Sequence, residues 1–565
     1  MPEFDSIVYK WYNGLGTWID ITTDVQAGVR GSCGILSTDI NSRTGGIGTL
    51  NLTLDNSELN SAGLLGYYTP RHPNCIGINW GKPYYYPIKI IFTYQGRQKV
   101  LRYTFEPGPN GISVTPGQYG SRKVSASFRN WMGFAQERKL NLLPSYSEKR
   151  ADEAIELILA ELDADEQPQA KSINTGNSTF EAVFDDTNSG TTVMGELSKL
   201  ALSELGYIYV RADRNEGETL VFENRNLRYQ TGGLILTTSS SLDDGGALML
   251  ETGDYLLLED GDNLLLDAAF STVSAVSVSD EDCGLLLLET GDYLLLEDGD
   301  NLILNETVSA DFTDADIQVN RNFDVRYFDN PYHSVRVSVQ QKETGDSTVT
   351  LWSMEKPLYI ANGQTITGIH GRYRDPSGGS SYINGVYDST DHAAFANENG
   401  TGTDYSGNIT VTADAGSAEV KHQLHNSGPA CYVIQLDAIG FPIYSYDSLD
   451  IVNGDDTGKK RLDVNLHYET DAAVAQRFSD VLTRNPNGTR TIQRLPLFAN
   501  KNNFNMNAFM DLDVGSLINV SEEVTYPDLD NPFFINGYEF EIIGVNNVFW
   551  YPNGFPYSRV YIPEE

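Results

Sequence analysis

The chain contains 565 residues, which is enough for roughly three to five domains of ordinary size. It is rich in Gly, Asn, Asp, Thr, Ser and Tyr and poor in long helical patterns, so its composition indicates a mainly β protein. The formal net charge of −38 argues against non-specific nucleic-acid binding and against docking on an anionic membrane, because both require basic patches. Solubility alone is the simplest explanation of this charge.

Cysteine usage and the chain start favour a protein that does not use the secretory route. The four cysteines are isolated in the sequence: Cys33, Cys75, Cys283 and Cys431. We therefore expect neither a disulfide framework nor a zinc site, and we expect the chain to be made in a reducing cytoplasm. The first residues lack the basic and apolar regions of a signal peptide. Acidic residues interrupt every leucine cluster, so no segment is expected to insert stably in a membrane.

Alternating apolar and polar residues predict a series of strands in residues 1–135, which we take as one β domain. The clearest strand is residues 50–54, where Leu-Asn-Leu-Thr-Leu alternates strictly before the turn Asp55-Asn56. Further strands are predicted at residues 7–9, 18–21, 86–92 and 124–128.

A small α/β domain is predicted over residues 136–235. Ser147 is expected to cap a helix whose apolar residues recur at helical spacing, namely Ile155, Ile158, Leu159 and Leu162. A second helix is expected from about Thr192 to Leu205, with Gly206 as the C′ residue that ends it. The strands expected to follow are residues 207–210 and 220–222.

A repeat with an offset of 38 residues lies within residues 236–310. Residues 246–267 return almost unchanged at 284–305, and both copies contain leucine runs followed by Glu-x-Gly-Asp. These patterns predict short strands and tight turns. Two copies are too few for a free-standing solenoid, so we expect an acidic, leucine-rich β-hairpin insert that needs a partner. Deleting about residues 242–306 is expected to leave the flanking halves folded but to damage assembly or attachment.

Strand patterns resume after the insert. Residues 346–460, rich in Gly, Ser, Asn and Asp, are expected to form a β-sandwich domain with long loops. Residues 311–345 and 461–565 are expected to form a second β domain, with a helix around Val474 and Phe478. The strands are predicted at residues 335–339, 409–412, 432–436, 518–520, 538–543 and 548–551.

The sequence contains no Gly-x-Ser-x-Gly elbow, no His-Glu-x-x-His and no Walker loop. We therefore expect no catalytic residues, no cofactor and no metal site. His422 and His425 are the nearest candidates for metal ligands, but a spacing of three places them on opposite faces of a strand. The run Gly45-Gly46-Ile47-Gly48 lies between strands and lacks the helix of a phosphate-binding loop.

Carboxylates leave two alternatives open. Pairs such as Glu259-Asp260 and Asp455-Asp456 have the residue types of a glycosidase, although solvated turn acids are the simpler interpretation. Acids of the repeat have the residue types of a calcium site but fit neither an EF-hand nor a calcium-binding nonapeptide, so turn formation is again simpler. These acids are Asp260, Asp262, Asp298 and Asp300.

Aromatic residues are plentiful, notably in Tyr84-Tyr85-Tyr86 and Trp550-Tyr551. They would allow stacking on sugars in a host-glycan site. Burial in sheets and subunit interfaces is the more common role of aromatics in β-rich chains, and we expect it here.

Several runs together resemble the tail hub, or minor tail, proteins of tailed bacteriophages. Residues 18–25, Trp-Ile-Asp-Ile-Thr-Thr-Asp-Val, are similar to the "W-x-D-V-T-x-x-V" opening of that family. Residues 45–56 resemble the strand that ends there in Leu-Asp-Asn, and Tyr68-Thr69-Pro70 resembles the following Tyr-x-Pro. Residues 88–94 and 124–131 resemble the next strand and the domain-closing motif.

The second half carries the resemblance as well. Residues 432–443 resemble a sandwich segment ending in "G-x-P-I", and residues 461–464 precede a helix as in the family. Residues 510–518 resemble the "D-x-G-x-x-V" region, with Ile518 in the last place. Phe534-Ile535-Asn536-Gly537 and Ile542-Ile543-Gly544 resemble its closing "I-x-G" segment. The leucine-rich insert lies outside the resemblance.

The resemblance implies a structural, non-enzymatic component of the virion at the tail tip or baseplate, assembled in the host cytoplasm. Two tube-like β-barrel domains per chain in a trimer would match the sixfold tail tube. Implied partners are the tail tube, distal tail and tape measure proteins and a tail fibre or central spike. The acidic charge would then repel DNA during ejection through the lumen.

Two other functions remain open. A receptor-binding, adhesin-like tail-tip protein would use its aromatics or residues 346–460 to grip host surface glycan. A glycan depolymerase would use an acidic pair and would lose activity when that pair is neutralised.

Overall fold

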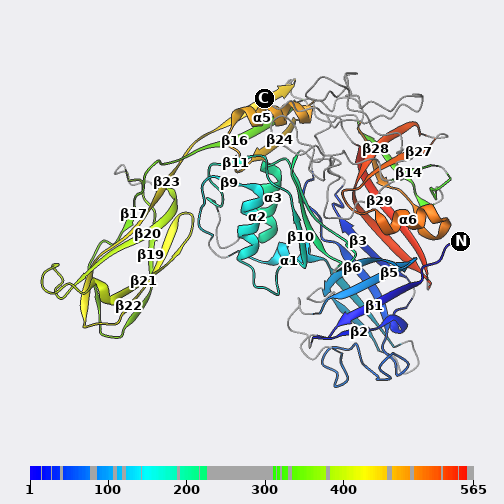
Figure 1. Ribbon diagram of the computed structural model, residues 1–565, viewed down its shortest axis with the longest axis horizontal. Coiled ribbons are helices and arrows are strands. Elements are labelled where there is room, and N and C mark those ends of the chain that lie inside the picture. Colours follow the sequence, from blue (N-terminus) through cyan, green and yellow to red (C-terminus); the bar gives the residue numbers. More distant parts are fainter. Residues whose placement is uncertain are drawn as a thin grey trace, which may run out of the picture.

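The computed structural model shows a body of sheets and helices from which a long β arm projects (Figure 1). It describes residues 1–225 and 310–556. Within these ranges the stretches not described are 14–15, 27, 38–41, 77–85, 106–110, 117–121, 141–142, 187–190, 216, 314, 319–320, 329–333, 377–381, 455–460, 484–488, 523–525 and 545. The expected repeat insert therefore lies outside the described residues, except for Ala310.

The first strands confirm the alternating pattern of the sequence. In β4 the side chains of Leu50, Leu52 and Leu54 are buried, whereas Asn51 between them is exposed. The strands of this region are β1 (Ser6–Tyr12), β2 (Trp18–Asp20), β3 (Val29–Gly34), β4 (Thr49–Asp55), β5 (Ile88–Tyr94), β6 (Arg97–Phe105), β7 (Ile112–Thr115) and β8 (Lys123–Arg129). A 3-10 turn, η1 (Thr22–Asp24), follows β2.

A small α/β unit follows, with a three-stranded sheet β10-β13-β12 and helices beside it (Figure 1). The expected pairing of the strands at 207–210 and 220–222 is confirmed, since Tyr209 lies opposite Val221. The elements are α1 (Trp131–Glu137), β9 (Lys149–Arg150), α2 (Ala151–Ala160), β10 (Ala170–Ile173), β11 (Thr179–Phe180), α3 (Val193–Ser203), β12 (Tyr207–Arg211) and β13 (Thr219–Glu223).

The start of α2 differs from the expected cap at Ser147. Residues 149–150 pair with β11 as a short strand, so the helix cannot begin before Ala151. Arg150 occupies the N-cap position, and its backbone N–H donates to the Glu153 carboxylate at 3.0 Å. The apolar face was nevertheless predicted correctly, because Ile155, Ile158 and Leu159 are buried.

The last strands form the other part of the body. They are β14 (Ala310–Phe312), β15 (Asp324–Phe328), β25 (Thr489–Arg494), β26 (Leu497–Phe498), β27 (Leu517–Glu522), β28 (Tyr526–Ile543) and β29 (Asn547–Pro556), with η5 (Ala499–Lys501) and α6 (Asn503–Asp511) between them. The strands expected at 518–520, 538–543 and 548–551 are confirmed within β27, β28 and β29.

The first and last strands belong to one sheet of fifteen strands, which runs β15-β25-β29-β28-β3-β4-β8-β6-β5-β1-β2 with β7, β14, β26 and β27 off this path. The mainly β class with a small α/β part is thus confirmed. The two expected tube-like regions are not separate closed barrels among the described residues, because β3 pairs with β28 and merges them. Their combined core contains residues from both ends of the chain, including Trp11, Phe92, Phe509 and Trp550.

The arm leaves the body as a ribbon of long strands (Figure 1). β16 (Ser334–Thr344) pairs antiparallel with β23 (Cys431–Gly454) and parallel with β24 (Arg461–Leu466). Helix α5 (Ala472–Thr483) packs its buried Phe478 and partly buried Val474 against this ribbon. The expected helix around these two residues is confirmed.

Beyond the ribbon the arm is a β-sandwich, as expected from the sequence. One sheet contains β17 (Val349–Ser353), β18 (Leu358–Ile360), β20 (Asn384–Phe395) and the first half of β23. The facing sheet contains β19 (Thr365–Arg372), β22 (Glu419–Asn426) and β21 (Ile409–Ala415), preceded by η4 (Ser406–Asn408). Ile360 and Val433 from the first sheet meet Leu424 from the second in the core between them.

Candidate functional site

The pairing of β3 with β28 forms a seam between the two ends of the chain. Six residue pairs make up this seam, from Gly34 opposite Gly537 to Val29 opposite Ile542. A Cβ on Gly31 would lie 2.5 Å from the ring of Phe540, so glycine lets that ring lie on the backbone of β3. The seam therefore depends on residues without side chains at its closest contacts.

A buried lysine strengthens the seam from one side. Lys99 of β6 is 3% exposed, and its ammonium donates to the carbonyl oxygens of Phe509 at 3.0 Å and Leu512 at 2.6 Å. It also lies 3.3 Å from the carboxylate of Asp513, to which the Tyr538 hydroxyl donates at 3.4 Å. The charge of Lys99 is thus balanced and hydrogen-bonded within the core, as buried charges require.

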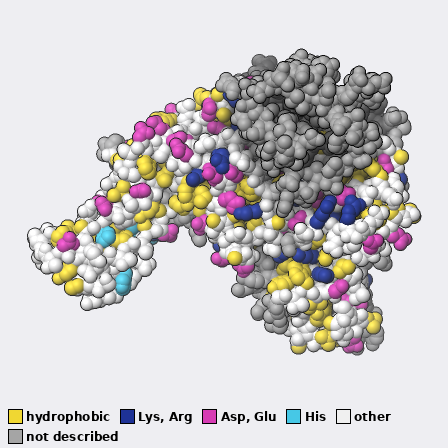
Figure 2. All heavy atoms as spheres, viewed as in Figure 1, with side chains coloured by type: hydrophobic (Ala, Val, Ile, Leu, Met, Phe, Trp, Pro, Cys, Tyr) yellow, Lys and Arg dark blue, Asp and Glu magenta, His cyan; other side chains and the backbone are white. Residues whose placement is uncertain are grey.

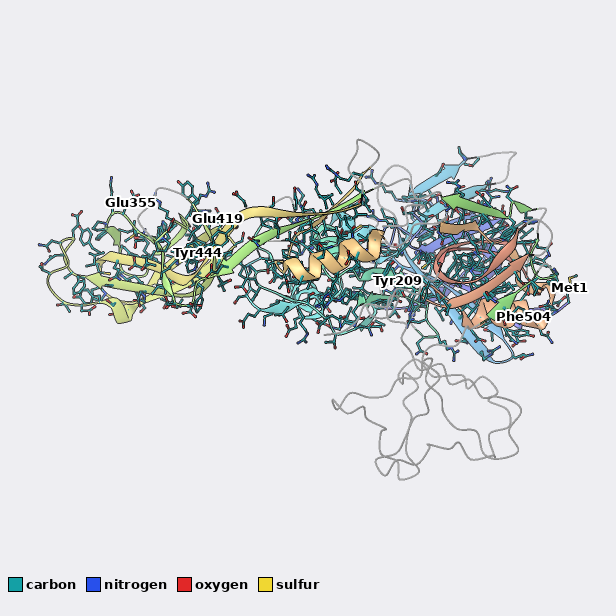
Figure 3. All side chains as sticks on the ribbon, turned by 90° about the horizontal axis from the view of Figure 1, so that it is seen from above. Met1, Tyr209, Glu355, Glu419, Tyr444 and Phe504 are labelled. Atoms are coloured by element: carbon teal, nitrogen blue, oxygen red, sulfur yellow. The ribbon has the colours of Figure 1, made fainter. Side chains whose placement is uncertain are left out.

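The α/β unit is held against the same seam. The Tyr209 hydroxyl donates to the Glu223 carboxylate at 2.5 Å and lies 3.3 Å from the carbonyl oxygen of Val514. The Cys33 thiol of β3 donates to the carbonyl of Val210 at 3.1 Å. Figure 3 shows Tyr209 at the boundary between the central helices and the sheet of the body. Three parts of the chain therefore meet at one buried polar region.

A buried glutamate lies at the other contact of the α/β unit with the first strands. Glu218 accepts a hydrogen bond of 2.6 Å from the backbone N–H of Trp131, and its carboxylate is 4.0 Å from the Arg102 guanidinium. Burial raises the pKa of Glu218 to about 7, and the nearby Arg102 only partly opposes this rise. Its charge therefore changes near neutral pH.

The root of the arm is fixed to the α/β unit by a second buried ion pair. Lys342 of β16 lies 2.8 Å from the Asp185 carboxylate, and both side chains are almost fully buried. Burial raises the pKa of Asp185 even though Lys342 lowers it. Asn384 donates to the Asp185 carbonyl at 2.7 Å, and the Tyr468 hydroxyl donates to the buried Glu196 carboxylate. These contacts make the arm an extension of the body.

An open groove with a volume of about 350 Å³ lies between the edge strands β17 and β19 of the arm. Its lining combines two aromatic rings with cationic and other polar side chains. The lining residues are Trp352, Ser353, Glu355, His370, Arg372, Arg374 and Tyr382. The backbone N–H of Arg374 donates to the Leu351 carbonyl at 2.9 Å, which fixes the two walls relative to each other.

The histidine pair behaves as the sequence predicts. His422 is buried and His425 is exposed, since they occupy opposite faces of β22. Burial lowers the pKa of His422 to about 4, and its Nε2 lies 2.9 Å from the Thr390 hydroxyl. Among the residues that the structure describes, no group of three His, Cys, Asp or Glu side chains is placed to hold a metal ion.

Of the remaining candidates from the sequence, the glycine run at residues 45–48 is described by the structure and the paired carboxylates are not. Gly45 donates its N–H to the carbonyl of Ile208 at 2.6 Å, and Gly48 accepts at its carbonyl from the N–H of Asn130 at 2.9 Å. This run therefore bonds to the body's own backbone. Outside the described residues lie Glu259-Asp260, Asp455-Asp456 and the four repeat acids Asp260, Asp262, Asp298 and Asp300.

The aromatic runs singled out in the sequence are buried where they are described. Tyr86, Trp550 and Tyr551 are each at most 5% exposed, which confirms the core role expected for them. Tyr84 and Tyr85 lie outside the described residues. The exposed aromatic of the arm groove is instead Tyr382, at 53% exposure.

Sequence reasoning missed the groove. The signal was the alternation His370-Gly371-Arg372-Tyr373-Arg374, in which a histidine and two arginines share one face of β19 and its extension. Their aromatic neighbours come from distant positions in the sequence, so no local pattern joins them.

No protein-family model matches the chain, and no curated protein matches its sequence. Solved structures do. A tail protein of Neisseria meningitidis has 11% identity and a TM-score of 0.42, with 99% of this chain and 100% of that chain covered. The 43 kDa tail protein of prophage MuSo2 from Shewanella oneidensis has 9% identity and a TM-score of 0.39, with 97% and 98% covered.

This chain is similar in structure to bacteriophage tail proteins. A third example is the prophage tail protein gp18 of Listeria monocytogenes, with 7% identity, a TM-score of 0.35, and 97% and 94% of the two chains covered. No described helix has the length and apolar character needed to cross a bilayer.

Proposed function

We propose that this protein is a structural, non-enzymatic tail hub of a tailed bacteriophage. It closes the distal end of the tail tube and docks a fibre or central spike. Its neighbours in the virion would be the tail tube, distal tail and tape measure proteins. The order of the family-like motifs along the chain and the phage tail proteins of similar fold support this proposal.

The observation that carries the proposal is the continuous sheet through the seam. Each chain places two sets of strands side by side, with β2 at one end of the sheet path and β15 at the other. Such ends have unpaired backbone groups that favour pairing with another strand. In a trimer, β2 of one subunit would meet β15 of the next, so that six sets of strands encircle the lumen.

The charge of the chain fits a conduit for DNA. A net charge of −38 would repel the phosphate backbone from the lumen wall, so DNA would pass without being captured. Figure 2 shows acidic side chains distributed over both arm and body on the viewed face. A neutral or basic wall in the assembled ring would contradict this part of the proposal.

Electron microscopy of the virion tail tip tests the main claim. We expect three copies that close the tube. Six copies, or a position in a peripheral fibre, would contradict a hub.

Cross-linking tests the subunit contact independently. Asp20 ends β2 and Arg326 lies in β15, and both are exposed. A D20C/R326C double variant is expected to form covalent trimers on oxidation, whereas each single variant is not. If assembled trimers of the double variant stay uncross-linked, the two sheet edges do not meet as proposed.

A further inference from the structure

The arm groove, defined above by its seven lining residues, has a composition that the structural role of the body does not require. Its volume of about 350 Å³ lies within the range of small-molecule sites, which are roughly 300 to 1,000 Å³. It is far from the seam, on the part of the molecule that projects outward (Figures 1 and 3).

One arginine of the groove is held in place and still has hydrogen-bonding capacity. The guanidinium carbon of Arg372 lies 4.2 Å from the centroid of the Tyr382 ring, a cation–π contact that holds the guanidinium beside this ring. Within the described residues, no carboxylate lies within 4 Å of this guanidinium. The N–H groups at its edge are therefore available to a planar anion, which a guanidinium binds with two parallel hydrogen bonds.

Charged side chains of both signs lie near Arg372. Lys421 lies opposite His370 in the sheet ladder and adds a positive charge beside Arg372 and Arg374. Three acids counter this charge: Glu419 opposes Arg372 in the ladder, Asp414 opposes Lys421, and Glu355 lies 3.6 Å from Arg374. Figure 3 labels Glu355 and Glu419 on the arm.

The remaining wall offers flat apolar surface. Trp352 lies against the backbone of Gly371, where a Cβ would come within 2.3 Å of its ring. Its ring also stacks on His422 at 5.5 Å, with an angle of 25° between the rings. The tryptophan is thus held rigidly, beside the exposed ring of Tyr382. Rigid aromatic surfaces next to a few oriented polar groups suit ligands with both apolar faces and polar edges.

We propose that this groove binds an acidic saccharide, with its carboxylate or phosphate on Arg372 and a sugar ring against Tyr382 and Trp352. A sugar ring has apolar C–H faces and hydroxyl edges, which match this wall. An inorganic anion would leave the aromatic wall unused, and a neutral sugar would leave Arg372 without an acceptor. The proposal goes beyond the structural role, and the two can fail separately.

The test uses the full-length protein on an array of immobilised bacterial surface polysaccharides, both acidic and neutral. We expect binding to be restricted to acidic ones. The best acidic oligosaccharide is then titrated beside the same oligosaccharide after its carboxyl groups have been reduced or its phosphates removed. Affinity is expected to fall at least about tenfold when the charge is removed.

Matched variants locate the site. R372Q and Y382A are each expected to weaken binding about tenfold or more, and since both residues are exposed, neither change should unfold the protein. R214Q is the control, because it also removes one exposed guanidinium but on the body. All variants should assemble into tails as the wild type does.

Three outcomes would overturn the proposal. The first is an array without preferential binding to acidic polysaccharides, and the second is equal affinity of R372Q and R214Q. The third is competition by soluble polyglutamate as strong as by the oligosaccharide, which would identify an acidic protein segment as the ligand. If the protein binds acidic glycans but does not occupy the hub position in the virion, the proposed function is overturned and the proposed glycan site stands.

Discussion

The ammonium group of Lys99 donates a 2.6 Å hydrogen bond to the carbonyl oxygen of Leu512, a residue 413 positions later in the chain. Together with the β3–β28 pairing, this bond makes the first and last strands one folding unit. Stability of either half should therefore depend on the other.

Replacing Lys99 with methionine tests this dependence. K99M would remove the buried cation beside the Asp513 carboxylate and the donor to the carbonyl oxygens of Phe509 and Leu512, and removal of one partner of a buried ion pair typically costs about 3 to 5 kcal/mol. Urea unfolding should show this loss in the free energy of unfolding. The exposed K356M is the control and should change it by less than about 0.5 kcal/mol. A K99M midpoint equal to that of K356M would show that Lys99 does not join the halves.

The pH dependence of stability should contain a contribution from Glu218. Its pKa is about 7 in the folded protein and 4.5 ordinarily, so the folded state holds this proton over a pH range in which the unfolded state has released it. Stability is therefore lost as the pH rises from 4.5 to about 7, and the loss is complete above that range. Below pH 4.5 the group is neutral in both states and has no effect.

The variant E218Q should remove this contribution. Relative to wild type, it should gain up to on the order of 3 kcal/mol at pH 7.5 and nothing near pH 4. Urea titrations of both proteins at the two pH values measure the difference. Comparing the two proteins isolates Glu218, since burial also raises the pKa of Asp185, Glu196, Glu204 and Glu469. An equal gain at both pH values would show that Glu218 does not titrate in this range.

The sequence predicts that a glycine is needed at position 206 to end helix α3. The need for glycine is correct, but the reason is different. The left-handed residue after α3 is Leu205, with φ of 56°, and Gly206 donates its N–H to the carbonyl of Ala201 at 2.9 Å. Gly206 is required for another reason, because a Cβ there would lie 2.4 Å from the Glu223 carbonyl oxygen. The close approach of β13 is a tertiary fact that the local pattern does not contain.

The variant G206A should therefore destabilise the α/β unit by about 1 to 3 kcal/mol through this overlap. G407A is the matched control, since nothing lies within 4 Å of a Cβ at Gly407. Thermal unfolding should separate the two variants. Equal midpoints would mean that β13 moves away from residue 206 at little cost.

The difference between local patterns and tertiary contacts also explains how much of the fold could be predicted from the sequence. Strict alternation located β4, and the apolar face of α2 was predicted because both patterns are local. The merging of both ends into one sheet was not, because no local pattern tells residues 29–34 to pair with residues 537–542. The groove was missed for the same reason: Trp352 and Arg372 are joined only by the packing of two sheets.

Asp24 provides a last test, of how the loop after β4 is held. Its fully buried carboxylate accepts hydrogen bonds from the backbone N–H of Ser61 at 2.6 Å, from the Ser61 hydroxyl at 2.7 Å and from the Tyr68 hydroxyl. In D24N an amide NH2 group takes the place of one carboxylate oxygen, so its N–H donors point at the N–H and O–H donors of Ser61 and Tyr68. We expect a loss of about 1.5 to 3 kcal/mol.

Because the donors of these three hydrogen bonds all belong to Ser61 and Tyr68, the effect of D24N should be local. Hydrogen exchange should accelerate most at the amide of Ser61 and its neighbours, while the seam strands remain protected. D404N is the control, since the Asp404 carboxylate accepts hydrogen bonds from the N–H and hydroxyl of the nearby Ser406 in an exposed turn. If exchange in D24N rises equally in β3 and β28, Asp24 supports the whole body, and the loop is no separate unit.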